Sequence, residues 1–109
     1  MNKEKTRMQI YCADGDIDDV TCDAVYGCSM EEDEKGGLRC KSFFTGRINI
    51  MKVPVPMGSS ICMVVEQMSR GDKNLEFFLL RTVHDVIMRR LDSLVSEIKK
   101  DGGSKHGGN

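Results

Sequence analysis

The sequence predicts an α+β protein: a three-stranded antiparallel sheet, or a four-stranded one in an alternative interpretation, followed by a short helix and a long C-terminal helix. Three observations lead to this class. Apolar and polar residues alternate in segments between residues 6 and 52, as in half-buried strands. Prolines at 54 and 56 end that pattern. From residue 74 onward, apolar residues recur every three or four positions, which forms one face of a helix.

Alternation places the three strands over residues 6–13, 20–29 and 38–52. Asp14-Gly15-Asp16 supplies turn residues after the first strand, and residues 31–37 are expected to form an exposed acidic loop. Gly46 indicates a bulge or bend within the third strand. Three consecutive strands of this kind are typical of an antiparallel meander with one face in water.

Residues 60–69 fit two interpretations. The β-branched run would suit a short fourth strand. Helical spacing fits as well, and we choose the helix because its polar residues then fall opposite its apolar ones. The apolar positions are Ile61, Val64, Val65 and Met68, and the polar positions are Glu66, Gln67 and Ser69.

The long helix is predicted over residues 74–100, with Asn74 or Asp72 as its N-cap and Gly102-Gly103 as its end. With 109 residues, the chain has room for one domain. We expect a single α+β domain over residues 1–101 and a flexible tail over residues 102–109. The apolar face of the helix consists of Phe77, Leu80, His84, Ile87, Leu91, Leu94 and Ile98.

This apolar face narrows in the second half of the helix, and a narrow apolar stripe that extends past the core usually packs on a partner helix. A homodimer or docking on another protein would satisfy it. The alternative is that the chain's own second helix or N-terminal strands cover it, and the sequence leaves both open. His84, as a polar residue in this stripe, would fix the register of a helix pair or act as a pH switch; the alternative, which we favour, is a partly exposed histidine at the edge of the core. The predicted partner or dimer interface is His84, Ile87, Leu91, Leu94, Val95 and Ile98.

Charge is unevenly distributed along the first half of the chain. The acidic block, predicted to form a face for a basic partner, is Asp14, Asp16, Asp18, Asp19, Glu31, Glu32, Asp33 and Glu34. The basic third strand would present a small nucleic-acid face consisting of Arg39, Lys41, Phe43 and Arg47. The near-neutral net charge of −1 argues against strong phosphate binding. Alternatively, the two blocks pair with each other across adjacent strands.

No pattern of catalytic, cofactor-binding or metal-ligating residues emerges. The five cysteines include no C-x-x-C pair, and zinc sites usually draw ligands from such pairs. Asp14, Asp16 and Asp18 begin like an EF-hand loop, but Asp19 stands where the turn needs glycine and Val25 where a bidentate carboxylate is needed. We therefore expect no catalytic residues, no cofactor and no bound metal.

The leading hypothesis is a small, non-enzymatic, cytoplasmic interaction protein that acts by contact with a protein partner, in the manner of microbial or phage accessory factors and inhibitors. That comparison rests only on the short length of the chain, its cysteine content and its lack of a recognisable site. The alternative hypothesis is a nucleic-acid-binding regulator that uses the basic third strand. No apolar run is long enough to span a bilayer, so no membrane partner is expected.

Overall fold

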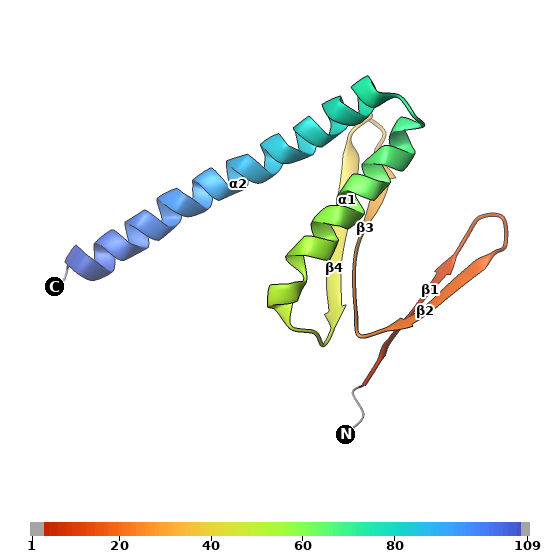
Figure 1. Ribbon diagram of the computed structural model, residues 1–109, viewed down its shortest axis with the longest axis horizontal. Coiled ribbons are helices and arrows are strands. Elements are labelled where there is room, and N and C mark those ends of the chain that lie inside the picture. The colour runs from red at the N-terminus through yellow and green to blue at the C-terminus, as the bar shows by residue number, and fades with distance from the viewer. Residues whose placement is uncertain (1–3, 108–109) are drawn as a thin grey trace. The chain divides into compact units, whose positions relative to one another are not determined.

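The computed structural model describes residues 4–107, and of residues 103–107 the backbone only. The chain is α+β, as predicted: two antiparallel sheets of two strands each precede a short 3-10 turn and two helices (Figure 1). It divides between Pro54 and Val55 into two compact units. The first unit contains the strands and the second contains the helices. The predicted single domain over residues 1–101 stays a prediction.

The first hairpin pairs β1 (Thr6–Tyr11) with β2 (Ile17–Cys22). Its turn is closed by hydrogen bonds from the Cys12 amide to the Asp16 carbonyl at 2.8 Å and from the Gly15 amide to the Cys12 carbonyl at 3.0 Å. Gly15 adopts a φ of 97°, which favours glycine. Residues that face one another in the register share one side of the hairpin, and Met8 with Val20 forms an apolar pair of this kind.

The second hairpin pairs β3 (Ala24–Glu32) with β4 (Leu38–Gly46). One side is apolar and the other is polar, as alternation requires. The register places these residues on the apolar side: Tyr26 with Phe44, Met30 with Cys40, and Cys28 with Ser42. The polar side carries Gly27 with Phe43, Ser29 with Lys41, and Glu31 with Arg39.

The strands therefore differ from the predicted meander in two places. The strand predicted over residues 20–29 is divided at Asp23, which belongs to neither β2 nor β3. The strand predicted over residues 38–52 ends at Gly46, and Ile50–Lys52 forms a 3-10 turn capped by Asn49. Gly46 has a φ of 115°, so it leaves the extended conformation and ends the ladder. Two separate hairpins result instead of one three-stranded sheet.

Helix α1 (Pro54–Ser69) settles the choice left open for residues 60–69 in favour of a helix. It also begins earlier than predicted, because proline fits the first turn of a helix, where the backbone N–H has no helical partner. The buried side of α1 is shifted by one residue toward the C-terminus from the predicted apolar side. Val65 and Ser69 are buried, whereas Val64 and Met68 are 49% and 54% exposed. The Ser69 hydroxyl donates to the Val65 carbonyl at 2.7 Å, which satisfies this buried polar group.

Helix α2 (Lys73–Gly107) is one unbroken helix, about 50 Å long at 1.5 Å per residue (Figure 1). Asp72 is its N-cap, because its carboxylate accepts from the Leu75 amide at 3.1 Å. The helix continues through Gly102 and Gly103, where its end was expected. The interpretation of residues 102–109 as a flexible tail stays a prediction, and residues 108 and 109 lie outside the described part of the chain.

Candidate interaction surface

On the second unit, apolar side chains recur at regular spacing along α2. We call it the heptad seam and define it by its residues: Phe77, Leu80, His84, Ile87, Leu91, Leu94 and Ile98. Their spacings alternate strictly between three and four over three heptads. A straight helix drifts about 20° per heptad from a strict seven-residue repeat, so a repeat kept this long is typical of helices that supercoil around one another.

The heptad seam is largely exposed along α2, from Phe77 at 67% exposure onward, and of its residues Leu80 and Leu94 are half-buried. Ile87 and Leu91 are 49% and 47% exposed, and Ile98 is 66% exposed. Val95, the remaining apolar residue of the predicted interface, is 49% exposed. Since the helix continues without a break on both sides of Met88, these residues form one continuous stripe. The stripe has the exposure that a docking surface requires.

His84 lies within the heptad seam, and 63% of its side chain is exposed. Its Nδ1 atom lies 3.4 Å from a carboxylate oxygen of Asp85, its neighbour in sequence. Asp85 also lies 3.6 Å from Nε of Arg81, one helical turn earlier. This trio places a polar interruption at one point of an otherwise apolar stripe, which is how helix pairs fix their register.

Residues beside the heptad seam were missed at the level of sequence, although the same spacing identifies them. If Phe77 is assigned position a of a heptad, Glu76, Val83, Arg90 and Glu97 occupy the g positions. Arg81, Met88 and Val95 occupy the e positions. These two rows flank the seam, and in coiled coils the residues at such positions influence the choice of partner and orientation.

The predicted acidic residues are divided between the two hairpins. Asp14 and Asp16 lie at the turn between β1 and β2, and Asp18 and Asp19 lie on β2. Arg7 holds Asp19 by two hydrogen bonds, from Nε at 3.1 Å and from Nη2 at 2.6 Å. The hydrogen bonds from Arg7 and then from Gln9 lower the pKa of the Asp19 carboxyl below its usual range. The hydrogen bond to Asp19 in turn raises the pKa of Arg7.

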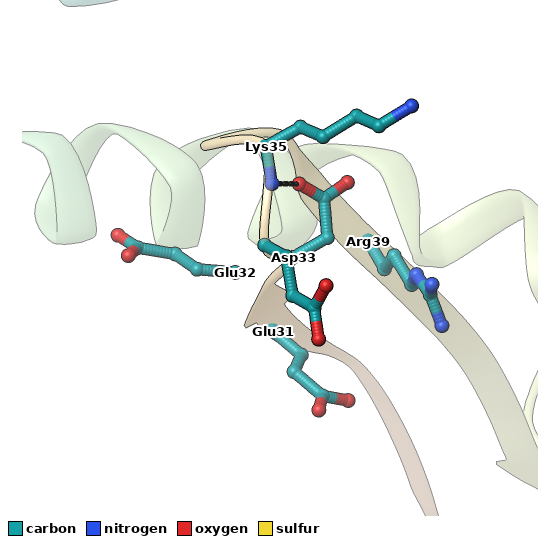
Figure 2. Close-up of a pocket in the computed structure, with 6 residues that line it drawn as sticks. Glu31, Glu32, Asp33, Lys35 and Arg39 are labelled. Carbon is teal, nitrogen blue, oxygen red and sulfur yellow. Dashed lines mark hydrogen bonds between the residues drawn. The ribbon is translucent and has the colours of Figure 1, made fainter.

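The second acidic group surrounds the turn between β3 and β4 (Figure 2). Asp33 folds back on this turn, and its Oδ1 accepts from the amides of Lys35 at 2.9 Å and Gly37 at 2.8 Å. Glu32 points away from Arg39 in Figure 2, whereas Glu31 stands opposite Arg39 in the strand register. Glu34 lies exposed in the turn itself. Asp33 therefore stabilises the turn, because its carboxylate accepts hydrogen bonds from two backbone amides.

The predicted nucleic-acid face is brought together in part. Arg39, Lys41 and Phe43 share the polar side of β4, and the Phe43 ring lies over Gly27 on the neighbouring strand. Arg47 is wrongly placed on this face, because β4 ends at Gly46 and the alternation of side chains stops there. The Arg47 amide instead donates to the Asp23 carbonyl at 3.0 Å. Glu31 and Arg39 stand opposite each other in the strand register, and pairing between the charge blocks stays a prediction.

Cys22, Cys28 and Cys40 lie on β2, β3 and β4, Cys62 lies on α1, and Cys12 lies just after β1. Cys22 donates from Sγ toward the Ala24 carbonyl at 3.3 Å, and Cys28 and Cys40 lie diagonally across the apolar side of the second hairpin. Partial loss of hydration, together with the hydrogen bond to Cys28, raises the pKa of Cys40. Within residues 4–102, whose side chains the structure describes, no three His, Cys, Asp or Glu side chains are grouped as metal ligands would be.

No helix in the described part of the chain combines the length and apolar character that crossing a bilayer requires. A comparison with protein family models, with curated protein sequences and with solved structures gives no match to this chain.

Proposed function

We propose that this chain is a small, non-enzymatic, cytoplasmic interaction protein of the accessory-factor or inhibitor type, which binds a protein partner through the heptad seam. The observation that carries the proposal is the exposed apolar stripe on an unbroken helix, from Ile87 to Ile98. The charged turns of the two hairpins would then contribute to the choice of partner and to the rate of association.

The energetic argument follows from apolar area. Complete burial of a large aliphatic side chain contributes roughly 1.5–3 kcal/mol, so covering the exposed half of Ile87, Leu91 or Val95 contributes about 1 kcal/mol each. A few such residues from each partner contribute enough to offset part of the entropy lost on association. The polar residues on the back of the helix, such as Asp92 and Ser96, would remain in water.

Adjacent residues on α2 offer a matched test. Ile87 lies in the heptad seam at 49% exposure, and Val86 lies beside it, outside the seam, at 55% exposure. Tagged wild-type chain, Ile87→Asp and Val86→Asp are used for capture from native host lysate, and bound proteins, including untagged copies of the chain, are identified by mass spectrometry. We expect Ile87→Asp to lose its bound proteins and Val86→Asp to keep them. Equal retention by both variants would contradict the proposal.

A second candidate function is binding of single-stranded nucleic acid by the second hairpin. The observation that favours it is the placement of Arg39, Lys41 and the 48%-exposed Phe43 on one side of β4, with the Phe43 ring close to Gly27 on the neighbouring strand. Base stacking on an aromatic ring beside cationic side chains is the usual design of such surfaces. Glu31, opposite Arg39, reduces the positive potential at one end of this surface.

Fluorescence anisotropy with a labelled single-stranded oligonucleotide tests this second candidate. Affinity should fall steeply between about 50 and 200 mM salt, because phosphate contacts release counterions. The triple reversal Arg39→Glu, Lys41→Glu and Arg47→Glu should abolish binding, whereas Arg47→Glu alone should have the smaller effect. Absence of salt-dependent binding by the wild-type chain would remove this candidate.

A further inference from the structure

We propose that the partner of the heptad seam is a second copy of this chain, with the two α2 helices paired parallel and in register. This inference rests on the proposed function, because it names the occupant of the same surface. It goes further in fixing the orientation of the pair, and the charges that flank the seam decide that orientation.

A helix is the element that the seam fits. The seven positions advance in strict steps of three and four from Phe77 to Ile98, so they remain on one line only if two helices wind around each other. Packing on a sheet would favour a wider stripe that follows the 3.6-residue period instead. The back of the second half carries Asp85, Arg89, Asp92, Ser93, Ser96 and Lys99.

Charge complementarity selects a parallel pair of identical helices. In a parallel coiled coil, a g residue meets the e residue five positions later on the partner. Glu76 therefore faces the partner's Arg81, and two-fold symmetry repeats this pair of opposite charges. Within the described part of one chain, Glu76 (23% exposed) lies 3.8 Å from Lys73, and Arg81 lies 3.6 Å from Asp85; ion pairs with such exposed partners are weak.

Antiparallel pairing would place like charges together. In that arrangement the g rows of the two helices meet each other. Two antiparallel registers overlap most of the seam. One places Glu76 beside the second copy's Glu97, and the other places Arg90 beside the second copy's Arg90. Like charges side by side oppose association, so both registers are disfavoured relative to the parallel one.

Further contacts between the flanking rows of the parallel pair bring no like charges together. Val83 meets Met88 of the second copy, which widens the apolar contact. Arg90 meets Val95, and the aliphatic stem of arginine can cover a valine while its guanidinium stays in water. Within the seam, His84 faces the second copy's His84, and a polar residue at one a position restricts register at some cost in stability.

The mass of the purified chain in solution gives the first test. Size-exclusion chromatography with light scattering should give twice the chain mass of 12.2 kDa for the wild-type chain and for Val86→Asp. Ile87→Asp should give the monomer mass, with its helix content retained in circular dichroism. If the wild-type chain is still monomeric at a concentration about 100 times that used for lysate capture, the inference is overturned.

Charge reversal gives the second test and addresses orientation. Glu76→Arg and Arg81→Glu should each raise the dissociation constant of the dimer, by about tenfold if the two symmetric pairs together change by 1.4 kcal/mol. The double variant should recover most of this loss in a parallel pair. An antiparallel pair keeps Glu76 and Arg81 apart, so failure of the double variant to recover would overturn the parallel arrangement.

The two proposals fail separately. If the wild-type chain is monomeric while Ile87→Asp still loses a different protein from the lysate, the second copy is wrong as occupant and the interaction surface stands. If Ile87→Asp changes neither the mass nor the captured proteins, the interaction surface itself is wrong.

Discussion

The backbone of Gly46 lies directly against the backbone carbonyl of Asp23, with no room for a side chain between them. A Cβ atom at Gly46 would lie 2.6 Å from the Ala24 Cα and 2.8 Å from the Thr6 hydroxyl oxygen. The next amide, that of Arg47, donates to the same Asp23 carbonyl at 3.0 Å. This contact joins the end of the second hairpin to the bend between the hairpins.

Gly46→Ala should therefore destabilise the strand-containing unit by about 2 kcal/mol or more. A positive φ at a residue other than glycine costs on the order of 1–3 kcal/mol, and the clash here involves backbone, which cannot move aside easily. Chemical denaturation followed by far-ultraviolet circular dichroism measures the change.

Gly15→Ala is the matched control for this substitution. Gly15 has a φ of 97°, similar to the 115° of Gly46, but a Cβ there would meet nothing within 4 Å. Its substitution should cost about 1 kcal/mol, from conformation alone. Equal losses at the two glycines would show that close packing at Gly46 contributes nothing.

The same contact explains how far the strands could be predicted from sequence. Val20, Cys22, Ala24 and Tyr26 keep one parity across Asp23, so the alternation gives no sign that the chain bends there. The end of β4 depends on the positive φ of Gly46, which the sequence indicated as a bend but not as a strand end. Arg47 was predicted to lie on the same strand for that reason, although β4 ends at Gly46, whereas Arg39, Lys41 and Phe43 do share one side of β4.

For the helices, the pattern of apolar residues along α2 could be predicted from the sequence, but its exposure could not. Spacing alone identified the line from Phe77 to Ile98, because its residues recur every three or four positions over many turns. Exposure could not be predicted, since a stripe buried in its own chain and a stripe exposed for a partner have the same spacing. The start of α1 was missed because Pro54 and Pro56 were taken as breaks, although a first turn tolerates proline.

Asp33 offers a second prediction, on the turn between β3 and β4. Its carboxylate accepts hydrogen bonds from the amides of Lys35 and Gly37, so Asp33→Ala should destabilise the strand-containing unit by about 1 kcal/mol. Amide hydrogen exchange at Lys35 and Gly37 should rise at the same time. Glu34→Ala, at the neighbouring exposed position, should leave both measurements unchanged. An effect as large at Glu34 as at Asp33 would show that charge, and not the turn, is responsible.

The pair of Arg7 and Asp19 predicts how the first hairpin responds to acid. The pKa of the Asp19 carboxyl is lower in the folded chain than in an unfolded one, so the stabilisation is complete above the unfolded pKa, about 3.9. It is lost as the pH falls below that value and through the folded pKa. Asp19→Asn should remove this part of the acid dependence and weaken the hairpin at neutral pH. Carboxyl chemical shifts from NMR, followed between pH 7 and 2 in the wild-type chain, measure the Asp19 titration, and chemical denaturation of both chains at neutral and acid pH measures the change in stability.

Arg7→Lys is the informative control for that titration. Lysine keeps the positive charge but cannot form the paired hydrogen bonds from Nε and Nη2 that arginine makes. The Asp19 titration should then move back toward the usual range in the Lys variant. An unchanged titration would mean that charge alone, without the paired geometry, lowers the pKa.

The thiols on the apolar side of the second hairpin give the last prediction. Partial loss of hydration and the hydrogen bond with Cys28 raise the pKa of Cys40, and the thiolate is the form that reacts with alkylating reagents. Cys28→Ala should therefore lower the pH at which Cys40 is half-labelled by iodoacetamide, as measured by mass spectrometry of the peptide. Cys22→Ala is the control, since Cys22 contacts backbone carbonyls and lies on β2. An unchanged half-labelling pH of Cys40 in the Cys28→Ala variant would contradict this arrangement.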